Sequence, residues 1–133
     1  MKKIISFLLV LVIAAQMFSI VAFAATNKYE TSLSFQGEHT GPARDYTGTD
    51  MHWYGRTTEQ YGEPTFPDTF YVCLYRKNWL GSTKIGDTIE CDRVGYHDLE
   101  WSDVGSGTYY FFYYKARDGA NVNSSKITME MTP

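Results

Sequence analysis

Motifs of catalysis and of metal binding are absent from this sequence of 133 residues. No serine stands in the G-x-S-x-G arrangement of a nucleophile elbow. The histidines, His39, His52 and His97, lack the spacing of metal ligands, and the two cysteines do not form a C-x2-C pair. We therefore expect no catalytic residue, no metal site and no cofactor, and we expect each histidine to lie at the surface or in a loop.

Cysteine is scarce, with only Cys73 and Cys91 in the chain. Exported bacterial proteins can oxidise their thiols, so we predict one disulfide between these two residues. It would close a loop of about 18 residues and stabilise the fold by roughly 3 kcal/mol in the chain-entropy model. The alternative is two buried free thiols that behave as small apolar side chains.

Helical periodicity is also missing, because Gly, Asp, Asn, Ser and Pro recur at short intervals and would break an amphipathic helix. The runs between them are short and rich in Tyr, Phe, Val, Ile and Thr, which is typical of strands. No internal repeat is visible, which excludes repeat architectures. The fold class that remains is all-β.

The N-terminus has the layout of a secretory signal. Lys2 and Lys3 precede an apolar stretch over residues 4–24, which ends in the small-x-small sequence Ala-Phe-Ala. We predict that residues 1–24 are a signal peptide removed on export, as in a Gram-positive bacterium. A retained membrane anchor is the alternative, since the stretch is nearly long enough to span a bilayer, but the cleavage site argues against it. We therefore expect a secreted protein with no stable membrane association after cleavage.

The mature chain, residues 25–133, has the length of one domain with a single core. Loss of Lys2 and Lys3 with the signal changes the formal net charge from −3 to −5. An acidic surface repels phosphate groups, so nucleic acid and anionic membranes are not expected as partners. The sequence leaves the oligomeric state open.

Seven short strands are predicted in the mature chain, at spacings typical of a sandwich. The alternation of apolar and polar residues is clearest in the first of them. We predict a single antiparallel β-sandwich and leave open whether it is jelly-roll-like or immunoglobulin-like. Gly105-Ser106-Gly107 is predicted to be a tight turn and Asp118-Gly119 a hairpin turn. The predicted strands span residues 29–36, 51–57, 69–77, 85–94, 98–104, 108–116 and 126–132.

A pattern in the last half of the chain is shared with known proteins. It comprises FYVCLYR at 70–76, KIG at 84–86, WSDVGSGTYYF at 101–111 and KARDG at 115–119. In this pattern the chain resembles a group of small, secreted, uncharacterised proteins of Bacillus-type bacteria and their prophages. The resemblance implies export and a β-sandwich, but it implies no activity and no site residues.

Aromatic residues are unusually frequent, at 17% of the chain. The strands at 69–77 and 108–116 are apolar or aromatic on both faces, so the face outside the core must be either covered or exposed. Exposed aromatic rings stack on sugars and anchor protein interfaces, although tyrosine rings can also lie flat on a sheet with only their hydroxyls in water. We predict a ligand-binding surface, whose residues are Trp79, Tyr75, Tyr110 and Tyr114.

These features predict a secreted, non-catalytic binding module whose ligand is a cell-wall glycan or an extracellular protein. A secreted antagonist, such as a bacteriocin-like toxin or an enzyme inhibitor, is an alternative suggested by the small size and export. A small glycoside hydrolase is a further alternative, because such enzymes use paired carboxylates. The pairs Glu90 with Asp92 and Asp98 with Glu100 have suitable spacing, but they are expected on the solvent face of their strands.

Overall fold

The computed structural model describes residues 27–60 and 68–133, so the predicted signal peptide lies outside the described residues. Within them every regular element is a strand, and no helix is long and apolar enough to cross a membrane. The strands are β1 (Lys28–Phe35), β2 (Glu38–Thr40), β3 (Arg44–Tyr46), β4 (Asp50–Gln60), β5 (Thr69–Asn78), β6 (Gly81–Asp92), β7 (Gly95–Trp101), β8 (Gly107–Tyr114) and β9 (Asn121–Thr132).

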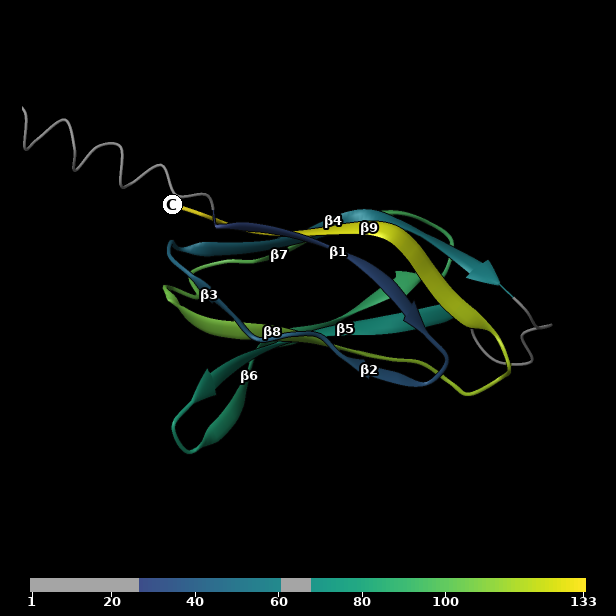
Figure 1. Cartoon of the computed structure of the whole chain (residues 1–133), viewed down its shortest axis with the longest axis horizontal. Coiled ribbons are helices and arrows are strands. Elements are labelled where there is room, and N and C mark those ends of the chain that lie inside the picture. The colour runs from purple at the N-terminus through teal and green to yellow at the C-terminus, as the bar shows by residue number, and fades with distance from the viewer. Residues whose placement is uncertain (1–26, 61–67) are drawn as a thin grey trace, which may run out of the picture.

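The strands form two antiparallel sheets that pack as a sandwich (Figure 1). One sheet has the order β1-β9-β4-β7, and the other has the order β2-β8-β5-β6, with β3 also paired to β8. The pairing is nested, since β1 pairs with β9, β2 and β3 with β8, β4 with β7, and β5 with β6. This nesting is that of a jelly roll. The predicted all-β sandwich is confirmed, and its topology is the first of the two left open.

The core lies between the sheets and is filled by alternate residues of each strand. Phe70, Val72 and Leu74 of β5 are fully buried, and the indole of Trp53 on β4 lies opposite them in the core. Trp53 donates its indole N–H to the Tyr113 hydroxyl at 2.8 Å, so its polar atom is satisfied. Burial of an apolar side chain such as Phe70 contributes about 2–3 kcal/mol.

His97 is half-buried and not fully exposed, because it lies on the inward-facing side of β7. Its ring centroid lies 5.7 Å from that of Phe70 and 6.4 Å from that of Trp53. Burial lowers the pKa of His97 below its ordinary 6.5, and this effect exceeds the opposing influence of Asp92. The side chain also contacts the Thr57 hydroxyl at 3.1 Å. His97 therefore packs against the edge of the core.

A β-bulge interrupts the pairing of β5 with β6. Val72 pairs with Ile89, but Leu74 pairs with Ile85, so three residues of β6 face the single residue Cys73. Gly86 begins the bulge with a φ of 65°, a conformation that glycine adopts readily. The bulge is held from the other sheet by Trp101, whose indole N–H donates to the Asp87 carbonyl at 3.2 Å.

The predicted disulfide is wrong, because Cys73 and Cys91 are free thiols on opposite faces of the sheet. Cys91 pairs with Phe70 and therefore points into the core, where burial raises the pKa of its thiol to about 12. Cys73 has the opposite parity on β5, and its Sγ lies 3.2 Å from the Thr88 hydroxyl. A bridge would require one strand to turn over. The alternative of two buried free thiols is the observed state.

Two other expectations differ from the structure. Residues 37–50, which lie between the first two predicted strands, contain β2 and β3, and these together cover one edge of β8. The turn at 118–119 does not close a hairpin as predicted, because it connects β8 and β9 of different sheets, and the turn at 105–107 likewise leads from β7 in one sheet to β8 in the other. Turn residues show that the chain reverses direction, but they do not show which sheet the next strand joins.

Candidate functional site

Five aromatic side chains gather on the outer face of the five-stranded sheet, and we call this surface the aromatic face. All five are half-buried, and they alternate with residues that point into the core. The alternation explains the arrangement, since a strand with aromatic residues at every position must send half of them outward. The aromatic face consists of Tyr71 and Tyr75 on β5 and of Tyr110, Phe112 and Tyr114 on β8.

The rings of the aromatic face pack in cross-strand pairs. Tyr71 stacks on Tyr114 with centroids 4.8 Å apart, and Tyr75 stacks on Tyr110 at 5.3 Å with an interplanar angle of only 7°. Phe112 links the two pairs, because its ring meets that of Tyr75 edge-on at 6.3 Å. Contacts of this kind are favourable by about 0.5–1.5 kcal/mol each and hold the rings in place before a ligand arrives.

Polar side chains border the aromatic face on both sides. Glu38 and Thr40 of β2 pair with two of its residues, and Lys84 and Glu90 of β6 pair with two others. Tyr114 is hydrogen-bonded to the side chain of Thr88, while burial, followed by the nearby Cys73 and Tyr71, raises the pKa of its hydroxyl. The surface thus offers ring faces together with neutral hydroxyls and charged groups of both signs.

The predicted binding residues fall into two places. Tyr75, Tyr110 and Tyr114 are brought together on the aromatic face, whereas Trp79 lies apart, at the turn between β5 and β6. Tyr71 and Phe112 complete the aromatic face but were not selected from the sequence. Their positions in the strands were the available signal. Each lies an even number of residues from a selected tyrosine of the same strand and therefore points to the same face.

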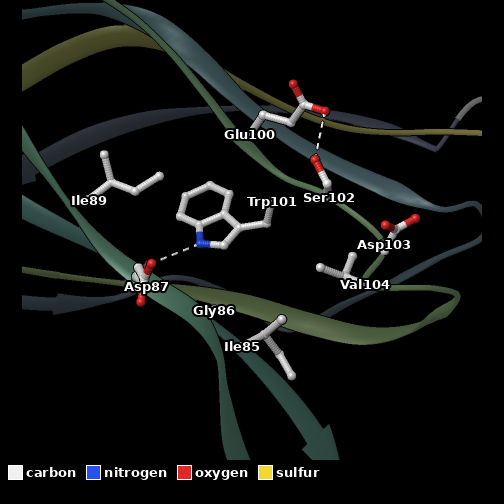
Figure 2. Close-up of a pocket in the computed structure, with 9 residues that line it drawn as sticks. All are labelled: Ile85, Gly86, Asp87, Ile89, Glu100, Trp101, Ser102, Asp103 and Val104. Atoms are coloured by element: carbon white, nitrogen blue, oxygen red, sulfur yellow. Dashed lines mark hydrogen bonds between the residues drawn. The ribbon is translucent and has the colours of Figure 1, made fainter.

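A deeper hollow opens between the edge strands β6 and β7, where the two sheets meet (Figure 2). Its volume is about 370 Å³, and the Trp101 indole lies at its centre in the view of Figure 2. The lining is mixed, with apolar side chains beside three carboxylates, of which Glu100 accepts a hydrogen bond from Ser102 at 3.1 Å. This hollow is too small for a polymer but suits a single small group. The lining residues are Ile85, Gly86, Asp87, Ile89, Glu100, Trp101, Ser102, Asp103 and Val104.

The outer face of the four-stranded sheet carries a shallow hollow of about 210 Å³. Tyr54 donates its hydroxyl to Glu130 there at 3.2 Å, and Tyr96 and Asp98 lie on its rim. The carboxylate pairs considered for hydrolysis are exposed on their strands, as expected. Within residues 27–60 and 68–133 no three His, Cys, Asp or Glu side chains are grouped to hold a metal ion.

A buried ion cluster joins the connections at one end of the sandwich. Arg93 has no exposed side-chain area, and its Nη1 lies 2.7 Å from Asp118 and 3.2 Å from Glu59. Lys115 also contacts Asp118, at 3.1 Å. The sequence indicated only a turn at Asp118, because the partners lie far away along the chain. The cluster ties the β6–β7 and β8–β9 connections to the end of β4 and has a structural role.

Comparison with known proteins gives a single kind of match. No family model and no curated protein matches the chain. Among solved structures, the CBM22-1 xylan-binding domain from Paenibacillus barcinonensis Xyn10C is similar, with 11% sequence identity and a TM-score of 0.44. The alignment covers 83% of this chain and 84% of that domain. We base the choice of ligand on the surfaces described above.

Proposed function

We propose that the domain is a secreted, non-catalytic module that binds a cell-wall glycan on its aromatic face. The observation that carries this proposal is the gathering of five aromatic side chains on one open sheet face, with two cross-strand pairs already stacked. Partly exposed, ordered aromatic groups on one sheet face are typical of binding surfaces.

The chemistry of the aromatic face suits a sugar polymer. Pyranose rings present apolar C–H faces that contact aromatic rings, and hydroxyls that need polar partners. The tyrosine hydroxyls can supply such partners, as can Glu38, Thr40 and Glu90 at the borders. The two stacked pairs lie four residues apart along β5, or about 13 Å, so a ligand that touches both is longer than one sugar ring.

The shape of the surface favours a glycan over a protein partner. The aromatic face is a band two strands wide with charged residues of both signs alongside it. A stable protein interface buries about 800 Å² on each partner around a core depleted of charge. A narrow aromatic band between polar borders is better matched to a linear chain.

The test is co-sedimentation of residues 25–133 with purified cell-wall sacculi, for the native domain and for the double variant Tyr75→Ala/Tyr110→Ala. We expect saturable binding by the native domain. The variant should lose at least tenfold in affinity, about 1.4 kcal/mol, because it removes one whole stacked pair. Circular dichroism checks that the variant folds. Tyr96→Ala is the matched control, since it removes an exposed tyrosine from the other sheet and should bind normally.

Two results would contradict the proposal. If the native domain and the double variant bind sacculi equally, the aromatic face is not the site. If neither binds but the domain captures a protein from the wall fraction, the ligand is an extracellular protein instead. Because the proposed module is non-catalytic, we also expect no release of reducing ends from sacculi during the incubation.

A further inference from the structure

The turn of the β5–β6 hairpin carries the two most exposed large apolar side chains of the described residues. Trp79 is 91% exposed and Leu80 is 77% exposed. Figure 1 shows this turn projecting away from the body of the sandwich. The Asn78 side chain accepts a hydrogen bond from the Leu80 amide at 3.0 Å, and Gly81 completes the turn with a φ of 146°. The chain thus holds an apolar pair out in solvent.

The charge of this hairpin is opposite to that of the whole protein. No carboxylate occurs between Asp68 and Asp87, although the full chain has a net charge of −3. Lys77 and Lys84 are exposed on the two strands beside the turn. Arg76 adds a third positive charge, and its guanidinium donates to the Ser106 carbonyl at 2.8 Å. Two apolar side chains therefore project from a basic collar.

We propose that this tip, formed by Trp79 and Leu80 with Lys77 and Lys84, docks onto the surface of an anionic lipid bilayer. Tryptophan favours the interface between membrane and water, and leucine favours the acyl region beneath it. The lysines would contact the anionic headgroups. From the net charge of the sequence we expected no anionic membrane as a partner. Salt screens charges that lie far from the contact, so the local positive charge of the tip decides whether it binds.

The observations favour lipid over a protein partner. The tip offers only two apolar side chains, far less surface than a stable protein interface buries. A contact of this size gives weak, reversible association with a bilayer, as single anchors do. The tip contains none of the five aromatic residues of the aromatic face, and only Lys84 lies beside both surfaces, so vesicle binding can be tested separately from glycan binding.

The test uses residues 25–133, which contain every strand of the sandwich, with vesicles of phosphatidylglycerol and of phosphatidylcholine. The Trp53 and Trp101 side chains are buried, so tryptophan fluorescence and its quenching by iodide report mainly on Trp79. We expect co-sedimentation, a blue shift of emission and protection from iodide with phosphatidylglycerol but not with phosphatidylcholine. High salt should reverse the binding.

Two variants separate the apolar and the basic contributions. Trp79→Ser/Leu80→Ser should abolish co-sedimentation with anionic vesicles. Lys77→Gln/Lys84→Gln should weaken it roughly fivefold for each charge removed. The matched control is Val94→Ser/Tyr96→Ser, which removes a second exposed apolar pair near an acidic turn and should leave binding unchanged.

Failure to bind phosphatidylglycerol vesicles would overturn the proposal, as would equal binding by Trp79→Ser/Leu80→Ser. Binding to sacculi that depends on Trp79, without binding to vesicles, would also overturn it and assign the tip to the glycan site. The aromatic-face variant Tyr75→Ala/Tyr110→Ala keeps the tip intact. It should still bind vesicles, so the two proposals can fail separately.

Discussion

At the scale of single residues, the charge at Asp118 shows how strongly the fold constrains one side chain. Burial alone would raise the pKa of this carboxyl, but hydrogen bonds from Arg93 and Lys115 outweigh burial and lower the pKa to about 2. A buried ion pair adds little to stability relative to an apolar pair, but removal of one partner is costly, because the other charge remains buried.

The lowered pKa of Asp118 predicts an acid-sensitive fold. The ordinary pKa of the carboxyl is 3.8, so its stabilising contribution is complete above that value and is lost as the pH falls toward 2. The shift corresponds to about 2 kcal/mol of unfolding free energy. Urea unfolding across this pH range measures the loss.

Asp118→Asn should remove this part of the pH dependence and should already destabilise the domain near neutral pH, by about 3 kcal/mol. Asp98→Asn is the control, because its carboxylate is exposed and the change should have little effect. Coincident curves of stability against pH for the native domain and Asp118→Asn would show that the cluster does not stabilise the fold.

At the scale of elements, the bulge in β6 decides which residues of β5 and β6 pair beyond Cys73. A Cβ on Gly86 would lie 3.1 Å from Cδ1 of Trp101, and the residue has a positive φ. Gly86→Ala should therefore destabilise the domain by about 1–3 kcal/mol, through backbone strain and crowding of the indole. Thermal or urea unfolding measures the change.

Gly119→Ala separates these two contributions. Gly119 also has a positive φ, of 82°, but a Cβ there would meet nothing within 4 Å. Gly119→Ala should lower the free energy of unfolding only through backbone strain. Any larger loss in Gly86→Ala therefore measures the contact with Trp101. Equal losses in the two variants would show that the bulge does not pack tightly on the other sheet.

Element prediction from the sequence succeeded where the alternation of side chains was strong. The strands at 29–36, 69–77 and 108–116 were found because their residues alternate or are apolar throughout. β2 and β3 were missed because three residues are too few to show a period. The disulfide was wrong because a bulge and a register cannot be read from spacing, and both decide which face a cysteine occupies.

The candidate site was predictable in kind but incomplete in detail. Aromatic residues at both parities of β5 and β8 required that one set lie outside the core, and the turn beside Gly81 predicted the exposure of Trp79. The sequence does not show which alternate residues of β5 and β8 face outward, since this depends on which face of the sheet packs against the other sheet. It also cannot show that Trp79 stands apart from Tyr75, because a hairpin can continue along its sheet or project from it.

At the scale of the whole molecule, the jelly roll presents two different surfaces without a shared residue. The aromatic face covers the centre of one sheet, and the basic tip extends from the same pair of strands at one end. The chain as a whole is acidic, with a formal net charge of −3. In this arrangement the domain would hold a glycan on its sheet while its tip touches a lipid surface.

The most direct test of the central claim is NMR mapping of residues 25–133 with soluble glycan fragments released from sacculi by a muramidase. Chemical-shift changes should concentrate on the five residues of the aromatic face and on Glu38, Thr40 and Glu90 beside it. Changes confined to the hollow around Trp101, to the four-stranded sheet or to the hairpin tip would contradict the claim, and so would the absence of any change at saturating fragment concentration.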